Sequence, residues 1–186
     1  MTDTVVYPIP DHFSEAHVTP ERYHTLYRQS LHDPDTFWSE QAQLLDWHSP
    51  WSAVSETNVT KGTARWFVDA KLNVSVNCID RHLPERAHDT AIIWEGDDPD
   101  DSQSFTYQEL KIQVCRFANA LRAQGIGKGD RVCIYMPMIP EAAFAMLACA
   151  RIGAIHSVVF GGFSPEALKD RINDATCSMV ITADEG

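Results

Sequence analysis

The sequence predicts an α/β protein, with a helical and irregular extension over residues 1–86 and the first part of a parallel-sheet βαβαβ subdomain over residues 87–186. The sheet is predicted by apolar runs of strand length at residues 131–136, 154–160 and 177–182. Helical segments separate these runs, at residues 140–151 and from Ser164-Pro165 onward. Such an alternation with short links is typical of parallel strands joined by right-handed crossovers. Because the third run is not followed by a helix, we expect the subdomain to be incomplete at its C-terminal end.

Two helices are predicted in the extension by proline at the first helical position. Thr19-Pro20-Glu21 and Asp33-Pro34-Asp35 each place a capping side chain before the proline, whose missing N–H costs nothing there. The second helix is expected to end at Pro50-Trp51, and its apolar face contains Phe37, Trp38, Gln41, Leu44 and Leu45. We expect no strand before about residue 65, and an irregular packing segment with one short helix over residues 64–82.

A hairpin and a long helix are expected before the parallel sheet. Residues 91–95 are strand-like, residues 96–101 form an acidic turn, and residues 104–106 return. Thr106 and Glu109 have the spacing of a capping box, so a helix starts here. Gly125 is expected to end this helix, whose apolar face contains Tyr107, Leu110, Val114, Phe117 and Leu121.

Composition narrows the class of protein. The formal net charge is -11, with 26 acidic and 15 basic side chains, which argues against nucleic acid or an anionic membrane as the main partner. The apolar run at residues 142–150 is too short to span a bilayer, and the N-terminal residues Met1–Thr4 lack the features of a signal peptide. Five scattered cysteines without a C-x-x-C pair are typical of reduced thiols. We therefore expect a cytoplasmic protein.

No motif in the sequence indicates a catalytic residue or a metal ligand. The glycines at 125, 127 and 129 follow a helix and precede a strand, the reverse of the dinucleotide fingerprint. Ser164 is interpreted as a helix cap rather than a nucleophile, because Pro165 and Glu166 do not fit a nucleophile elbow. The eight histidines lack metal-ligand spacing, and the acidic run at residues 97–101 is interpreted as a solvated turn.

One candidate binding site remains, at Phe160, Gly161 and Gly162. These residues end an apolar strand and precede a helix start, where α/β proteins usually bind ligands. Two glycines allow a phosphate or a flat ring to approach the backbone, and Phe160 can stack on an aromatic base. Two interpretations fit these residues equally well. One is a ligand site, and the other is a simple strand-to-helix turn that needs glycine conformations.

Several segments resemble the AMP-forming acetyl-coenzyme A synthetase family. The resemblance covers nearly the whole chain and is carried by residues 72–82, 129–141, 155–166 and 181–186. It implies the first part of the adenylate-forming fold and a ligase that makes acetyl-CoA from acetate, ATP and CoA through an acetyl-AMP intermediate, with Mg²⁺ bound to ATP. In this family, the phosphate loop and the catalytic lysine belong to segments that this sequence lacks.

The resemblance assigns one role to this sequence. Phe160, Gly161 and Gly162 match the family's turn that contacts the nucleotide end of coenzyme A, so they are expected to bind CoA. We expect the segment alone to be inactive. Two alternatives remain at this point: a related ligase for another short-chain acid such as propionate, and a non-catalytic α/β binding module.

Overall fold

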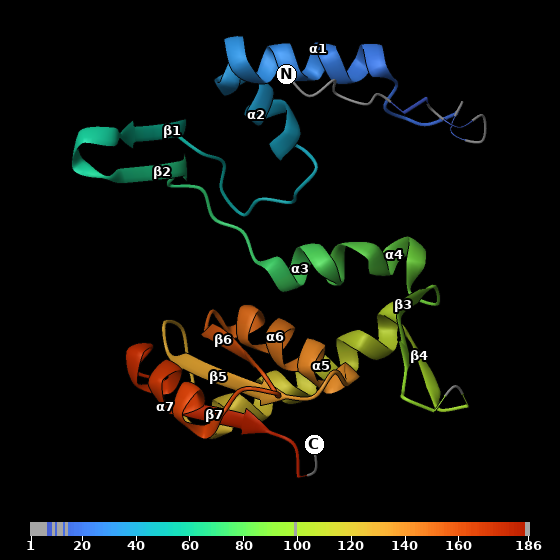
Figure 1. The fold of residues 1–186 in the computed structure, drawn as a ribbon, viewed down its shortest axis with the longest axis vertical. Helices are drawn as coiled ribbons and strands as arrows, with labels where there is room; N and C mark the ends of the chain where they lie inside the picture. The colour runs from blue at the N-terminus through green and yellow to red at the C-terminus, as the bar shows by residue number, and fades with distance from the viewer. Residues whose placement is uncertain (1–6, 9, 11–12, 14, 99, 185–186) are drawn as a thin grey trace. The chain divides into compact units, whose positions relative to one another are not determined.

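The computed structural model describes residues 7–8, 10, 13, 15–98 and 100–184. The N-terminal Met1–Thr4, Pro99 of the acidic turn and the final Glu185-Gly186 lie outside the described residues. The chain divides into two compact units, Met1–Leu44 with Trp51–Val68 and Leu45–Pro50 with Asp69–Gly186. Figure 1 shows the order of the elements along the chain.

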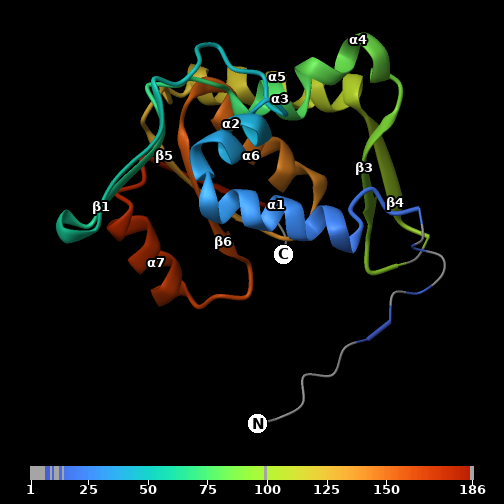
Figure 2. The same ribbon diagram turned by 90° about the horizontal axis from the view of Figure 1, so that it is seen from above.

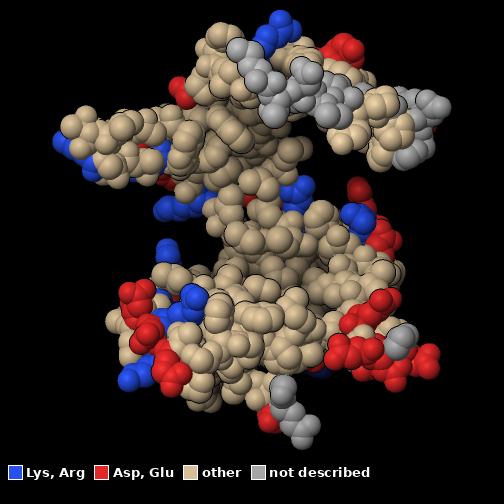
Figure 3. Space-filling view, in the orientation of Figure 1, with Lys and Arg blue, Asp and Glu red and all other residues tan. Residues whose placement is uncertain are grey.

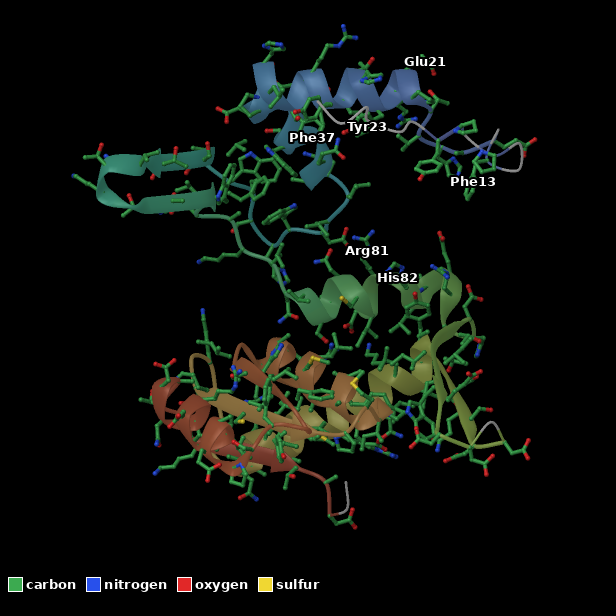
Figure 4. All side chains as sticks on the ribbon, viewed as in Figure 1. Phe13, Glu21, Tyr23, Phe37, Arg81 and His82 are labelled. Carbon is green, nitrogen blue, oxygen red and sulfur yellow. The ribbon has the colours of Figure 1, made fainter. Side chains whose placement is uncertain are left out.

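The first unit begins with the two proline-started helices, α1 (Pro20–His32) and α2 (Pro34–Ala42). Thr19 caps α1 by accepting a hydrogen bond from the N–H of Arg22, and Asp33 caps α2 by accepting from Thr36. Both predicted helix starts are therefore confirmed. Figure 4 labels Tyr23 of α1 and Phe37 of α2, which both line a small apolar hollow of about 280 Å³.

The predicted end of α2 is wrong. The helix stops at Ala42 rather than near Pro50, and Leu44 and Leu45 are exposed instead of completing an apolar face. The N–H groups of Gln43 and Leu44 donate to carbonyl groups only three residues back, at Glu40 and Gln41, so a tight turn ends the helix here. The spacing of the two leucines fits a helix face but does not show this turn.

The prediction of no strand before residue 65 is also wrong. β1 (Ala53–Asn58) and β2 (Thr63–Val68) form an antiparallel hairpin. Its connection is a single 3-10 turn, capped by the Asn58 side chain and closed by Gly62 at φ 62°. Only Val54 of β1 and Val68 of β2 are buried, so the strands lack the apolar alternation that marks a strand in a sequence.

The second unit begins with three short helical pieces: α3 (Val74–Cys78), the 3-10 turn η3 (Asp80–His82) and α4 (Leu83–Arg86). The expected short helix is therefore present. Asn73 caps α3 and also donates to the carbonyl groups of Ala150 and Arg151 at 3.1 Å each. Figure 4 labels Arg81 and His82 at the junction of η3 and α4.

A charged cluster attaches these short helices to the longer ones. The Asp80 carboxylate accepts hydrogen bonds from both terminal nitrogens of Arg151 at 2.7 and 2.8 Å. Lys111 lies 3.1 Å from the same carboxylate, and Arg151 also donates to the buried Ser75 hydroxyl. One carboxylate thus connects η3 to the two helices that carry Lys111 and Arg151.

The expected hairpin and capping box are confirmed by β3 (Thr90–Glu95), β4 (Ser102–Thr106) and α5 (Tyr107–Ala123). Acidic side chains gather over the hairpin turn in Figure 3, and the described ones there are exposed. The turn is closed by the hydrogen bond from Gly96 N–H to the Asp101 carbonyl group. In the capping box, the Thr106 hydroxyl accepts from Glu109 N–H, and the Glu109 carboxylate accepts from Thr106 N–H.

The capping box gives a testable prediction. Replacing Thr106 with alanine removes the acceptor for an N–H group of the first turn, so we expect the free energy of unfolding to fall by about 1 kcal/mol. Thr106→Ser keeps the hydroxyl and should retain most of the stability. Urea denaturation of the full-length protein measures the difference, and equal stability of the alanine and serine variants would contradict the capping role.

The parallel sheet consists of β5 (Arg131–Met136), β6 (Ile155–Phe160) and β7 (Met179–Thr182), in the order β6-β5-β7. Helix α6 (Pro140–Ile152) joins β5 to β6, and α7 (Pro165–Asp174) joins β6 to β7. The chain moves outward from β5 to β6 and then back past β5, so right-handed crossovers place the two helices on opposite faces. Figures 1 and 2 show the strands between α6 and α7.

The core lies on the face of the sheet that α5 and α6 cover. Val132 and Ile134 of β5 are buried there against Val114 of α5 and Phe144 of α6. The intervening Cys133 of β5 points to the opposite face and is also buried, so the prediction of a strand buried on both faces is confirmed. These elements confirm the predicted α/β class.

Candidate functional site

A cavity of about 480 Å³ opens at the C-terminal ends of the three parallel strands. It is lined by residues 135–138, 160–162 and 182–184. The chain leaves β5 toward α6 and leaves β6 toward α7, on opposite faces of the sheet. The crevice between these two strand ends is therefore a topological switch point, where open α/β sheets usually bind ligands.

The structure brings the three candidate residues together with two further segments. Phe160, Gly161 and Gly162 form the β6 wall of the cavity. The other walls are formed by residues 135–138 and 182–184, which no sequence motif had marked as site residues. The signal that could have found them is their position, because the C-terminal ends of parallel strands meet at one edge of the sheet.

Gly162 is needed for space rather than for backbone conformation, whereas a Cβ on Gly161 would make only ordinary contacts of 3.6 Å or more. Positive φ values occur at other described glycines, such as Gly125 and Gly153, but not at Gly161 or Gly162. A Cβ atom on Gly162 would lie 2.9 Å from Cε1 of Phe160, closer than real contacts allow. The ring of Phe160 therefore lies over Gly162, and the interpretation that this turn needs glycine conformations is wrong.

The aromatic part of the site is accessible. The Phe160 side chain is 64% exposed, and its ring makes an edge contact with that of Phe163 at 6.2 Å between centroids. The Arg171 guanidinium lies 4.8 Å from the centre of the Phe163 ring, on its face. An exposed ring beside a backbone without side chains can stack on a flat aromatic ligand.

Two side-chain donors, one from β5 and one from β3, position the cavity walls. The Tyr135 hydroxyl donates to the Gly161 carbonyl group at 2.8 Å and lies 3.3 Å from the Phe163 carbonyl oxygen. The indole N–H of Trp94 in β3 donates to the Met138 carbonyl group at 2.7 Å. Both bonds hold the backbone on either side of the crevice.

Two kinds of candidate nucleophile in the described residues have other roles or are protonated. Ser164 caps α7 by accepting from Ala167 N–H, as predicted, so its hydroxyl has a structural role. Burial raises the pKa of the Cys149 thiol to about 11 and also raises the pKa of Cys133, so neither is a thiolate at neutral pH. Among the described residues, no group of three or more His, Cys, Asp or Glu side chains is placed to hold a metal ion.

None of the described helices combines the length and apolar character needed to cross a bilayer.

Comparison with known proteins divides the chain into two matched regions. Residues 79–186 match the family model for AMP-binding enzymes, and residues 23–78 match the model for the acetyl-coenzyme A synthetase N-terminus. The AMP-binding region, residues 79–186, contains all the residues that line the strand-end cavity.

Curated relatives are similar over almost the whole chain. Acetyl-coenzyme A synthetase 2 of Pseudomonas putida is 69% identical over 171 residues, which are 92% of this chain and 27% of that protein. The acetyl-coenzyme A synthetases of Saccharophagus degradans and Alkalilimnicola ehrlichii are 61% and 62% identical over 100% of this chain. The chain covers 29% of the length of each of these two relatives.

These matches confirm the resemblance inferred from residues 72–82 and from the strand ends. The relatives carry the same family name as that resemblance, and they are more than half identical to this chain. The AMP-binding model alone covers more than half of the 186 residues, including the parallel sheet and its strand-end cavity. The chain therefore belongs to the AMP-binding enzyme family.

Proposed function

We propose that this chain is the N-terminal part of an acetate–CoA ligase, which makes acetyl-CoA from acetate, ATP and CoA through acetyl-AMP. The observation that carries the proposal is the match of residues 23–78 to the acetyl-coenzyme A synthetase N-terminus, directly before the AMP-binding region. The names of relatives that are 54–69% identical to the chain support the same activity. A cytoplasmic location belongs to the proposal and is supported by five free cysteines.

In this proposal, the strand-end cavity binds the nucleotide end of CoA. The exposed Phe160 ring stacks on the adenine base, and Gly161 and Gly162 let the ligand approach the backbone closely. The cavity lining contains the acidic Asp184 and no basic side chain. The charges that neutralise the CoA phosphates therefore come from outside this lining.

The catalytic steps are assigned to the remainder of the full-length protein. ATP and its Mg²⁺ ion require phosphate-binding and oxygen-rich groups, and the described residues contain no cluster fitted to the metal. We therefore assign no Mg²⁺ ligand to the described residues. The contribution of this chain to the reaction is to hold CoA beside the site where acetyl-AMP forms.

Isotope exchange between ATP and pyrophosphate tests the proposal in the full-length protein. We expect exchange that depends on acetate, followed by acetyl-CoA formation when CoA is added, and no exchange by residues 1–186 alone. Exchange with propionate but not with acetate would contradict the choice of acid. Absence of exchange with every short-chain acid would contradict the ligase and favour a binding module.

A further inference from the structure

The Tyr135 side chain links the central strand to the glycine turn. Tyr135 is the penultimate residue of β5, and its hydroxyl reaches the carbonyl oxygens of Gly161 at 2.8 Å and Phe163 at 3.3 Å. These residues are 26 and 28 positions further along the chain. The hydroxyl proton forms its shorter bond to Gly161, and the second carbonyl group lies within reach of the same proton.

Besides the Tyr135 bonds, the turn is held by one local backbone hydrogen bond and by ring contacts of exposed side chains. Phe163 N–H donates to the Phe160 carbonyl group at 3.1 Å, which closes the turn locally. All four residues from Phe160 to Phe163 are exposed, and the two central glycines have more conformational freedom than any other residue type. A turn of this kind samples several backbone conformations unless a long-range contact selects one of them.

Tyr135 is positioned to select one backbone conformation of the turn. β5 is the central strand of the sheet, paired with β6 on one side and with β7 on the other. Tyr135 is partly buried and pairs in register with Val159, which is itself buried. A rigid strand therefore carries the hydroxyl, and the hydrogen bond transfers this rigidity to the turn.

We propose that Tyr135 is a positioning residue for CoA, whose hydroxyl holds the Phe160–Phe163 turn in the conformation that binds the nucleotide end. The inference rests on the proposed function of the strand-end cavity. Its physical basis is preorganisation: a turn already ordered in the free protein loses less conformational entropy when the ligand binds. Tyr135 acts on CoA through the turn and takes no part in either chemical step.

Tyr135→Phe in the full-length protein tests this role, because it removes the hydroxyl and keeps the ring. We expect the KM for CoA to rise about three- to tenfold, the effect of losing one neutral hydrogen bond. The rate of acetate-dependent ATP–pyrophosphate exchange and the KM for ATP should stay within about twofold, since adenylation does not involve the turn. Tyr27→Phe is the matched control, because Tyr27 is half exposed on α1, and its KM for CoA should remain unchanged.

Amide hydrogen exchange tests the same role of Tyr135 without measuring enzyme turnover. In the absence of ligand, amides of residues 157–166 should exchange faster in Tyr135→Phe than in the wild type, and saturating CoA should reduce the difference. Amides of α5 should exchange equally in both proteins. Faster exchange throughout the second unit would instead show a general loss of stability and overturn the positioning role.

The outcomes separate the inference from the function on which it rests. An unchanged KM for CoA in Tyr135→Phe, with an active wild type, would overturn the inference alone. An equal fall in both half-reactions would make Tyr135 a folding residue and also overturn it. A wild-type protein without acid-dependent exchange would overturn the proposed function, and the inference with it.

Discussion

Replacing Asp80 with alanine is expected to lower the free energy of unfolding by about 2 kcal/mol, the cost of leaving a partly buried charge without its hydrogen-bonded partner. The Asp80 carboxylate accepts two hydrogen bonds from Arg151 and lies beside Lys111. The Arg151 and Asp80 side chains are only 20% and 23% exposed. Without the carboxylate, the Arg151 guanidinium loses its counter-charge in a partly buried position. Urea denaturation of the full-length protein, with amide exchange in α6 as the local readout, measures the loss.

The same cluster predicts a pH dependence. Hydrogen bonds from Arg151, followed by those from Lys111, lower the pKa of Asp80 from its ordinary value. A carboxyl group with a lowered pKa in the folded state stabilises the fold fully above its unfolded pKa of about 3.9 and loses that contribution as the pH falls through the folded pKa. Stability of the wild type should therefore decline below about pH 4, and Asp80→Asn should lack this part of the decline.

An exposed ion pair provides the matched control. Arg86 and Asp89 are 2.9 Å apart, but their side chains are 50% and 55% exposed. Pairs of this kind contribute little to stability because water and salt screen them, so Asp89→Ala should unfold like the wild type. If Asp80→Ala were no less stable than Asp89→Ala, the cluster would not be the attachment point of the short helices. The double variant Asp80→Leu with Arg151→Met should be less destabilised than the sum of the single changes.

Replacing Gly162 with valine is expected to raise the KM for CoA at least about tenfold, which corresponds to the loss of one base–aromatic stacking contact. The first carbon of any side chain at Gly162 would lie 2.9 Å from the Phe160 ring, and the methyl groups of valine extend further. The Phe160 ring is exposed, so it can move aside without breaking the core. The change therefore displaces the stacking ring and leaves the fold intact.

Steady-state kinetics of both half-reactions in the full-length protein measure the effect of Gly162→Val. ATP–pyrophosphate exchange should be retained, because the changed residue lies outside the proposed adenylation machinery. Gly127→Ala is the control: its added Cβ has 3.9 Å of clearance from Asp130, and Gly127 precedes β5 at the opposite end of the sheet. Loss of both half-reactions in Gly162→Val would show that the turn is a folding element rather than a binding site.

Local signals explain which elements could be predicted. The helix starts at Thr19, Asp33, Thr106 and Ser164 were all recognisable, because each cap forms within one turn of chain. The β1–β2 hairpin lacked such a signal. Its strands are mostly polar and exposed, and the pairing of Ala53 with Val68 joins residues that no local pattern connects.

The candidate site was likewise predictable from the sequence only in part. Phe160, Gly161 and Gly162 were predictable because an apolar run that ends at two glycines has an unusual local composition. The reason for Gly162 was not predictable, because its closeness to the Phe160 ring depends on how the turn folds. The wall at residues 182–184 depends on strand order, and β7 lies beside β5 although β6 precedes it in the sequence.

The sequence by itself determined the α/β class, the order of helices and strands in the sheet region, and the glycine turn as the candidate site. Each of these follows from periodicity, caps or composition within a short stretch of chain. Only the tertiary structure decided the contacts of Asp80 with Arg151, Trp94 with Met138 and Tyr135 with Gly161, which are 71, 44 and 26 residues apart. Hydrogen bonds across such separations depend on how the elements pack, and side-chain periodicity along one element carries no information about its partner.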